Sequence, residues 1–266
     1  MIRIETRGAF CFATLDAPAT RNALTDAMVT DLHAAVRSAA ASPGLRAFVL
    51  RGSGKTFCAG GDFSRFRALM ASPAGEVDPI IGFNRAFGAL LEALHDAPIA
   101  TVAVVEGAAF GGGVGLAAAC DFVLASDAAE LATPELTLGL PPAQIAPFIA
   151  SRLGEAAALR LLLTGRRLKA ADALVCGLVD EVLSLEELEP RVDALLVQLR
   201  RAEPAALRAT KAIVHRRRRH SLNNTLDFAA LQFAAAMRSG APSEGLAAFA
   251  ARRSTRWASD AEGTSS

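Results

Sequence analysis

Tyrosine is absent from this chain of 266 residues, and tryptophan occurs only once. Without a phenol, proton transfer would have to come from carboxylates, histidines or cysteines. The histidines show neither an HExxH motif nor another spacing typical of metal ligands: His33, His95, His215 and His220. The sequence therefore gives no support for zinc catalysis, and we expect no metal.

The sequence is also short of cysteine pairs, long apolar runs and excess charge. Its cysteines lie far apart and form no CxxC pair, which predicts reduced thiols and a cytoplasmic protein: Cys11, Cys58, Cys120 and Cys176. Charged residues interrupt both the N-terminal segment and the longest apolar run, so we expect neither a signal peptide nor a membrane span. The formal net charge of +1 gives no general reason to expect a nucleic-acid or membrane partner.

Hydrophobic residues make up 52% of the chain, and alanine and leucine supply much of this share, which favours helices over a β-sandwich. Short apolar segments alternate with amphipathic ones, a pattern typical of α/β folds. Strands are predicted at 2–5, 9–15, 47–50, 99–105, 122–125 and 178–183, and helices at 22–41, at 84–95 and from about 112. We expect an α/β core over residues 1–200 and a helical region over 201–266.

Two glycine-rich segments stand where predicted strands give way to helices, at residues 58–62 (CAGGD) and 111–113 (GGG). Phosphate-loop patterns are not complete at either place. The GKT at 54–56, just before the first segment, lacks the upstream glycine that a P-loop requires, and the second segment fits GxGxxG in no register. Backbone N–H groups at a helix start lack internal partners, so two such loops can stabilise negative charge on a carbonyl oxygen. Alternatively, the glycines serve only tight turns beneath a sheet.

Several motifs follow one another in a distinctive order along nearly the whole chain. They are RNAL at 21–24, FCAGGD at 57–62, EGAAFGGG at 106–113, CD at 120–121 and PELTLGL at 134–140. In this order the chain resembles the enoyl-CoA hydratase/isomerase (crotonase) family. The resemblance implies a crotonase-type spiral of ββα units with a helical C-terminal region, and an acyl-CoA substrate whose thioester oxygen is held by the N–H groups of Gly61 and Gly112. Coenzyme A enters with the substrate, so no resident cofactor is expected.

The resemblance also implies where coenzyme A and neighbouring subunits would bind. Contacts to coenzyme A, mainly through backbone groups, fall on Ala23, Ala59, Asp62 and Phe63. Phe249 and Arg252 or Arg253 would close over the adenine or its phosphate from a neighbouring subunit, with packing and solvated charge as the alternative roles. A homotrimer, or a hexamer of two trimers, is implied, with the apolar segment 226–237 at an interface.

The carboxylates decide which reaction of the family is expected. Members that hydrate with two glutamates carry one shortly after GGG, where this sequence has Gly115, and one after the next strand, where it has Glu135. A carboxylate between apolar segments is expected to have a raised pKa and to transfer a proton, unless Glu135 only caps a helix or forms a salt bridge. One such glutamate suffices in related enzymes to move a double bond, so Δ3,Δ2-enoyl-CoA isomerisation is the alternative to hydration of a 2-enoyl-CoA.

Residues 139–148 (GLPPAQIAPF) favour hydration. They resemble a segment of hydratases for branched glutaconyl-CoA substrates, such as isohexenylglutaconyl- or methylglutaconyl-CoA, which can lack the first glutamate. On this interpretation Glu135 orients water or protonates Cα, and Gln144 holds water or a substrate carboxylate, unless Gln144 only satisfies local backbone groups. We therefore predict a 2-enoyl-CoA hydratase, although the sequence leaves the acyl chain open.

A basic run at residues 215–220 (HRRRRH) is the sharpest concentration of charge. No aromatic residues interleave with the arginines, and basic residues at a helix C-terminus favour the helix dipole. A solvated helix end is therefore the preferred interpretation of this run. A non-catalytic protein that binds acyl-CoA or RNA is the remaining alternative.

Overall fold

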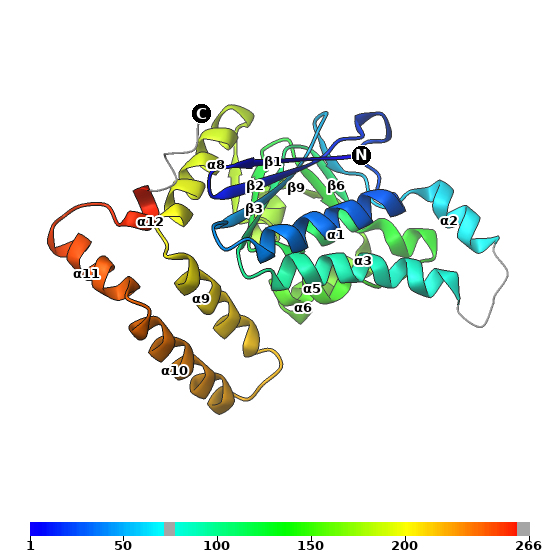
Figure 1. Ribbon diagram of the computed structural model, residues 1–266. Helices are drawn as coiled ribbons and strands as arrows, with labels where there is room; N and C mark the ends of the chain where they lie inside the picture. Colours follow the sequence, from blue (N-terminus) through cyan, green and yellow to red (C-terminus); the bar gives the residue numbers. More distant parts are fainter. Residues whose placement is uncertain (72–77, 260–266) are drawn as a thin grey trace.

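The computed structural model describes residues 1–71 and 78–259 and has two sheets flanked by helices (Figure 1). The larger sheet has the strand order β1 (Ile2–Arg7), β2 (Phe10–Leu15), β3 (Ala47–Gly52), β5 (Ala100–Val105), β7 (Phe122–Ser126) and β10 (Glu181–Leu183). The smaller sheet has the order β4 (Thr56–Cys58), β6 (Ala108–Phe110), β8 (Glu130–Ala132) and β9 (Leu168–Lys169). Neighbouring strands run parallel, apart from the antiparallel pairs β1–β2 and β8–β9.

The chain alternates between the two sheets. After β3, β5 and β7 in the larger sheet it enters β4, β6 and β8 in the smaller one. A helical segment follows each pair of strands: α2 (Phe63–Met70) with α3 (Pro79–Asp96), then α4 (Gly112–Ala119), then the 3-10 helix η2 (Pro134–Leu138) with α5 (Ala146–Leu153). This succession of ββα units is the predicted spiral, and the fold class is confirmed.

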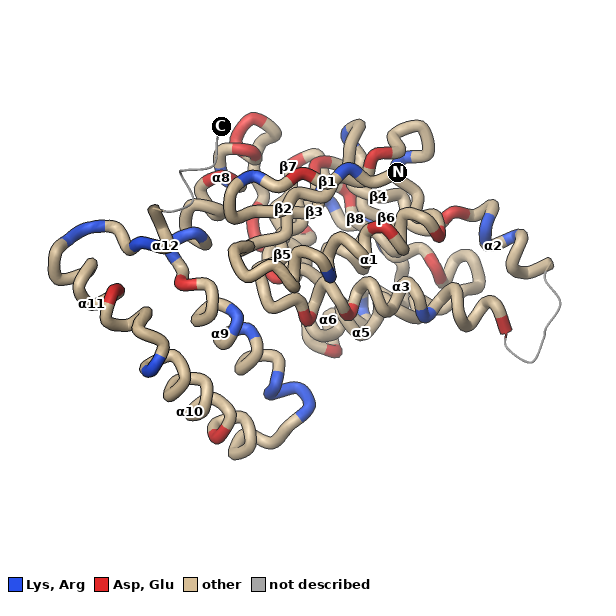
Figure 2. The backbone as a smooth tube through the Cα atoms, in the orientation of Figure 1, with Lys and Arg blue, Asp and Glu red and all other residues tan. Residues whose placement is uncertain are grey.

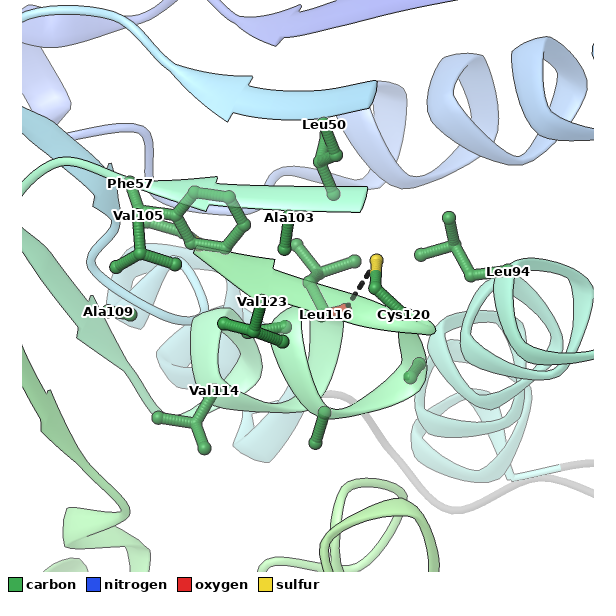
Figure 3. Packing of buried hydrophobic residues seen from close by; sticks show 14 of the residues in the cluster. Leu50, Phe57, Leu94, Ala103, Val105, Ala109, Val114, Leu116, Cys120 and Val123 are labelled. Carbon is green, nitrogen blue, oxygen red and sulfur yellow. Dashed lines mark hydrogen bonds between the residues drawn. The ribbon is translucent and has the colours of Figure 1, made fainter. Parts of the chain in front are cut away.

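The central parallel strands β3, β5 and β7 of the larger sheet are buried on both faces, which explains their unbroken apolar runs. On one face, α8 (Leu185–Arg200) packs Leu188 and Val192 against residues such as Val49 and Val102. On the other face lie α1 (Asp26–Ala41), α3 and α4. Figure 3 shows this second face, where Leu116 of α4 lies beneath Ala103 of β5.

Two predicted elements begin later than the sequence pattern suggests. The helix expected from residue 22 begins at Asp26, where the Thr25 side chain accepts a hydrogen bond from the backbone N–H of Met28. Asn22 itself is fully buried and has a left-handed backbone with φ of 56°. The strand expected at 178–183 forms only over Glu181–Leu183.

Between β4 and the predicted helix at 84–95, the chain forms a helix that the sequence analysis does not predict. This helix is the short α2, and α3 begins at Pro79, earlier than the predicted residue 84, because Asp78 caps it by accepting from the N–H of Ile80. Residues 72–77 lie outside the described part of the chain. The two remaining helices of the core are α6 (Glu155–Thr164) and α7 (Ala170–Val175).

The C-terminal helices first extend away from the two sheets, as Figure 1 shows, and the last one returns to the core, where Arg46 donates to the carbonyl of Trp257 at 3.2 Å. They are α9 (Pro204–Arg216), α10 (Leu222–Arg238), α11 (Ala241–Ala250) and α12 (Arg256–Ser259). They follow α8, which ends at Arg200, and the division into a core over residues 1–200 and a helical region over 201–266 stays a prediction. In the described part of the chain, no helix combines the length and apolar character needed to cross a membrane.

Asn22 offers a test of this fold, because its side chain holds three backbone segments together. Its Oδ1 accepts from the N–H of Ala17 at 2.9 Å, and its Nδ2 donates to the carbonyls of Ser53 at 2.9 Å and Thr56 at 2.7 Å. We expect Asn22→Ala to lower the free energy of unfolding by about 3 kcal/mol, since it leaves buried backbone groups unpaired.

Urea denaturation at one fixed protein concentration measures this change. The exposed Asn223→Ala substitution is the matched control and is expected to change stability by less than about 0.5 kcal/mol. Equal stability of the two variants would contradict a structural role for Asn22.

Candidate active site

Three loops at one edge of the smaller sheet form the candidate active site. The strands β4, β6 and β8 are parallel neighbours, so the chain leaves all three at the same edge of the sheet. The loops that follow contain Gly61, Gly112 and Glu135 respectively. Ligands of α/β folds bind at the carboxyl ends of parallel strands. The topology thus brings the three residues that the sequence singles out for catalysis to one place.

The first two loops approach each other so closely that side chains would separate them. A Cβ placed on Gly60 would lie 3.0 Å from the carbonyl oxygen of Phe110 and 3.8 Å from the backbone nitrogen of Gly112. A Cβ placed on Gly111 would lie 4.0 Å from the Cα of Gly60 and only 2.8 Å from Oε1 of Glu135. Both glycines also have positive φ, 95° at Gly60 and 51° at Gly111. Glycine is therefore required at both positions.

The N–H groups of Gly61 and Gly112 are oriented away from the bonds that hold their loops. Leu24 donates to the carbonyl of Gly60 at 2.8 Å and accepts from Asp62 at 3.2 Å. In this parallel bridge the N–H of the intervening Gly61 points to the other side. Gly112 is the first residue of α4, where an N–H group has no partner within the helix and the helix dipole is positive. Both groups are thus suited to bind an anionic oxygen.

Glu135 is half-buried, and one of its carboxylate oxygens is buried without a partner in the described part of the chain. Its Oε2 has no hydrogen-bond partner among the described residues, and no ion pair there includes it. Burial raises the pKa of the Glu135 carboxyl above its usual value, while a hydrogen bond from its own backbone N–H acts in the opposite direction. The hydroxyl of neighbouring Thr133 is also buried and unpartnered. Because such groups are rare in folded proteins, they mark a place for water or a ligand.

Aromatic side chains from α2 and α3 line the loops that carry the two donor groups. A Cβ on Gly61 would collide with the ring of Phe66, and a Cβ on Gly112 would lie 3.2 Å from the ring of Phe87. The rings of Phe66 and Phe83 pack edge to face with centroids 5.8 Å apart. An acyl group beside the donors would meet this apolar wall. Low polarity there strengthens every electrostatic interaction in the site.

The position of the absent second glutamate is filled by a neighbouring side chain. A Cβ on Gly115 would collide with the side chain of Ile145 and would lie 3.5 Å from Cδ1 of Leu91. Gly115 donates its N–H to the carbonyl of Gly111 at 3.1 Å, so the two residues lie one helical turn apart on the same side. Glu135 lies beside Gly111, and Ile145 fills the space beside Gly115, one turn further along α4. A carboxylate at residue 115 therefore has no room.

Gln144 makes a hydrogen bond that the sequence did not reveal. Its Nε2 donates to Oδ1 of Asn84 on α3 at 2.7 Å, rather than to local backbone groups. A side chain at Gly88 would overlap the Gln144 amide, so this glycine within α3 makes room for the pair. Asn84 and the three phenylalanines were not predicted as site residues. A glycine inside an amphipathic helix was the only signal that could have pointed to them.

The residues predicted to bind coenzyme A fall into two groups. Four of them lie near the glycine loops. Ala59 donates its N–H to the carbonyl of Arg21 at 3.0 Å, which places it beside Ala23. Asp62 caps α2 by accepting from the N–H of Ser64 at 2.8 Å, and this contact with Ser64 lowers the pKa of the Asp62 carboxyl. Phe63, the first residue of α2, is 55% exposed.

Phe249 and Arg252 lie elsewhere. They stand at the end of α11, which Figure 1 places on the far side of the molecule from α2 and β6. Phe249 is 85% exposed, and Arg252 has a left-handed backbone with φ of 51°. Within one chain, neither residue can reach the three loops. Their predicted contact with the coenzyme A adenine therefore requires a second copy of the chain.

Comparison with known proteins agrees with this geometry. The profile of the enoyl-CoA hydratase/isomerase family matches residues 5–260. A putative enoyl-CoA hydratase from Thermus thermophilus is 32% identical, over 97% of this chain and 100% of its own length. A probable enoyl-CoA hydratase from Rhizobium meliloti is 34% identical, over 94% of this chain and 95% of its own length.

Solved structures give the same result. The crystal structure of an enoyl-CoA hydratase/isomerase from Marinobacter aquaeolei has a TM-score of 0.93 and 38% identity, covering 97% of this chain and 98% of its own. Pseudomonas aeruginosa AtuE also has a TM-score of 0.93, with 41% identity over 97% of this chain and 99% of its own. Sequence and structure together show that this chain belongs to the enoyl-CoA hydratase/isomerase family and is an enzyme of the hydratase type that acts on acyl-CoA substrates.

Proposed function

We propose that the chain hydrates a branched 2-enoyl-CoA of the glutaconyl class, with Gly61 and Gly112 as oxyanion donors and Glu135 as the only carboxylate that moves protons. One observation carries this proposal. The unpartnered Oε2 of Glu135 is buried beside Gly111, where the two glycine loops cross. A base at this place and two converging N–H groups are the elements that addition of water to a conjugated thioester requires.

The chemistry balances with a single carboxylate. Hydrogen bonds from Gly61 and Gly112 to the thioester oxygen withdraw electrons from the double bond and make Cβ electrophilic. Glu135 accepts one proton from water as the water oxygen bonds to Cβ, which leaves negative charge on the thioester oxygen. The Glu135 carboxylic acid then returns that proton to Cα. Water has been added across the double bond, and the carboxylate is restored.

The amide pair of Asn84 and Gln144 supports a substrate with a second carboxylate. Phe87 lies against Gly112, and Leu91 lies against Gly115, so α3 runs alongside α4. Asn84 is one turn before Phe87 and thus lies beyond the N-terminus of α4, at the level of the donor groups. An amide N–H there can donate to a substrate carboxylate, while the phenylalanines pack against the branch of the chain.

Isomerisation of a 3-enoyl-CoA is the second candidate, and the filled space at Gly115 favours it. With Ile145 where a second acid would stand, Glu135 could carry one proton between Cα and Cγ without adding water. Hydration remains the proposal because the amide pair offers polar groups that isomerisation does not need. A protein that only binds acyl-CoA would have no use for a carboxylate held at a raised pKa.

The proposal includes an assembly of three or six copies. The outer helices leave large apolar side chains exposed, such as Leu231 and Phe233 on α10 and Leu246 on α11, and burial between copies would remove them from water. The same contact would bring Phe249 and Arg252 to a neighbouring active site.

Coenzyme A enters as part of the substrate. The cysteines of the structure are all free thiols, which supports a cytoplasmic protein.

A substrate panel tests the proposed function. We expect purified protein to remove the conjugated enoyl absorbance of 3-methylglutaconyl-CoA and, more slowly, of crotonyl-CoA. Gain of that absorbance from 3-hexenoyl-CoA, with no loss from the other two, would instead establish the isomerase. We further expect Gln144→Leu to raise KM for 3-methylglutaconyl-CoA by about tenfold, the value of one hydrogen bond to a charged group.

The same substitution should leave KM for crotonyl-CoA within about twofold, because that substrate has no second carboxylate. Gln198→Leu, at an exposed position of α8, is the matched control for lost amide groups. Equal effects of Gln144→Leu on both substrates would refute the role in carboxylate recognition.

Glu135→Gln is expected to lower kcat by about 100-fold or more, because an amide cannot accept the proton from water. The fold should persist. Since the pKa of Glu135 is raised in the folded state, its ionisation lowers stability as pH rises through that pKa. At neutral pH the glutamine variant is therefore expected to melt no earlier than the parent protein, as calorimetry can measure.

The pH profile gives an independent check. The free enzyme needs ionised Glu135, so kcat/KM should fall as pH decreases through a pKa above that of an ordinary glutamic acid. Glu130→Gln serves as the control. It removes a carboxylate that is partly exposed to solvent and lies 3.7 Å from Arg167. Full turnover in Glu135→Gln, or the same acid limb in that variant, would exclude Glu135 as the base.

Gly115→Glu tests the filled space. Restoring the second glutamate alone should fail, because its side chain collides with Ile145, and we expect a lowered melting temperature with no gain in turnover. The double variant Gly115→Glu with Ile145→Ala provides the space and should recover part of the lost stability. If the single variant is as stable as the parent protein, Ile145 is not the obstacle.

A further inference from the structure

A second concave site lies at the other end of α3 from the candidate active site. Phe87 of this helix contacts the donor loop, whereas His95 and Asp96 at its C-terminus line a cavity of about 300 Å³. At about 1.5 Å per residue, the two places are about 12 Å apart along the helix. The rest of the cavity wall comes from α9, from the turn that follows it and from Phe228 of α10. No step of the proposed hydration uses these residues.

Positive charge dominates the cavity. Its wall contains five arginine or lysine side chains and three histidines but only one carboxylate, that of Asp96. Figure 2 shows the basic residues gathered where α9 turns into α10. The formal charge of the whole chain is only +1, so this concentration is local. Like charges around one concavity produce a strong positive potential, which attracts anions.

Only part of this charge is neutralised within the chain. Lys211 pairs with Asp121 at 2.6 Å, and Arg219 lies 3.4 Å from Asp96 and 3.6 Å from Glu92. The remaining three arginines have no carboxylate partner among the described residues. Arg208 donates to the backbone carbonyls of Ala40 and Ser42. Arg216 lies over the ring of Phe228, 4.6 Å from the ring centroid. The side chain of Arg218 makes no hydrogen bond in the described part of the chain. An anion in the cavity would supply the missing counter-charge.

Two histidines stack at the edge of this cavity, and the pKa of one of them is lowered. The rings of His95 and His215 stack with centroids 4.6 Å apart, and Nδ1 of His215 lies 3.4 Å from Oδ1 of Asp96. Burial, followed by the nearby charge of Arg218, lowers the pKa of His95 to about 4. The imidazole is thus neutral at physiological pH, mainly because it is buried and in part because the nearby positive charge disfavours a further one.

The same histidines and Asp96 form a set of potential metal ligands, with donor atoms within 4.8 Å of one another. Two observations disfavour a metal. The nearly parallel rings, with 11° between their planes, do not converge on one point, and a tetrahedral ion needs convergent donors. Arg218, Arg219 and Lys211 surround the cluster, so a divalent cation would enter a positive potential.

We propose that this cavity binds a small phosphorylated anion, with Arg218 as its principal ligand. A guanidinium presents paired N–H donors whose geometry matches phosphate oxygens. A small molecule suits the cavity better than RNA, because Arg216 already covers the ring of Phe228 and the rings of His95 and His215 stack on each other, so these rings are not free for a base to stack on. The site is separate from the proposed hydration and does not depend on it.

Calorimetric titration of the intact assembly with pyrophosphate, at constant ionic strength, tests the proposal. We expect saturable binding that Arg218→Gln weakens by about tenfold or more, the contribution of a hydrogen bond between charged groups. Arg238→Gln removes the same charge from the exposed end of α10, outside the cavity, and should leave binding unchanged. Absence of saturable binding, or equal affinities of the two variants, would overturn the site.

Asp96→Asn separates an anion site from a metal site by the sign of its effect. Removing the only carboxylate of the cavity wall should tighten pyrophosphate binding, because a like charge is lost. A metal site would instead bind Zn²⁺ in the parent protein and lose it in this variant, and that result would overturn the proposal.

Two further measurements complete the test. A single-stranded RNA oligonucleotide that binds far more tightly than pyrophosphate, through Arg218, would show a nucleic-acid site instead. An increase of KM for enoyl-CoA in Arg218→Gln that parallels the loss of pyrophosphate would show that the cavity belongs to the coenzyme A site of a neighbouring copy. Unchanged KM together with weakened pyrophosphate binding supports a separate small-anion site.

Discussion

The close contact between two glycine loops is the constraint on which the active site depends. A β-carbon on Gly60 would lie 3.0 Å from the carbonyl oxygen of Phe110, one on Gly111 would lie 2.8 Å from Oε1 of Glu135, and both glycines have backbone conformations that other residues rarely adopt. In the proposed function, this close approach is what allows the N–H groups of Gly61 and Gly112 to bind one thioester oxygen. The third loop adds its carboxylate at the same crossing, so a wider separation of the loops would remove both the donors and the base from a shared substrate.

The sequence predicted what is local in this arrangement. Glycines after short apolar strands point to loops that expose backbone N–H groups, and the motif order that resembles the family then indicates Gly61, Gly112 and Glu135, because each motif is a short contiguous segment. The amide pair and the contact of Ile145 with Gly115 could not be predicted, since they join α3 or α4 to a segment many residues later. The helix start at Asp26 was missed for the same reason, because the side chain of Asn22 is used by tertiary contacts with residues 53 and 56.

The partial burial of the Glu135 carboxylate has a thermodynamic consequence. Burial that raises the pKa of Glu135 also makes its ionised form a cost to the folded state at neutral pH. Ile145 contributes to the same environment by filling the space beside Gly115 with hydrocarbon. A second carboxylate there would repel the first and would bring water into the site. The absence of a second glutamate and the apolar side chain that fills its place are therefore consequences of the same packing around Gly115.

The helix α3 extends from the candidate active site to the basic cavity. Its early turns face the donor loops with aromatic side chains, and its last turn carries His95 and Asp96 at the edge of the basic cavity. α9 also ends at this cavity. The C-terminal ends of helices carry partial negative charge, so two such ends offset part of the positive charge gathered there. This partial compensation allows the folded chain to keep a positively charged cavity without a bound anion. The charge of Arg218, which has no carboxylate partner in the described part of the chain, is then available to a ligand.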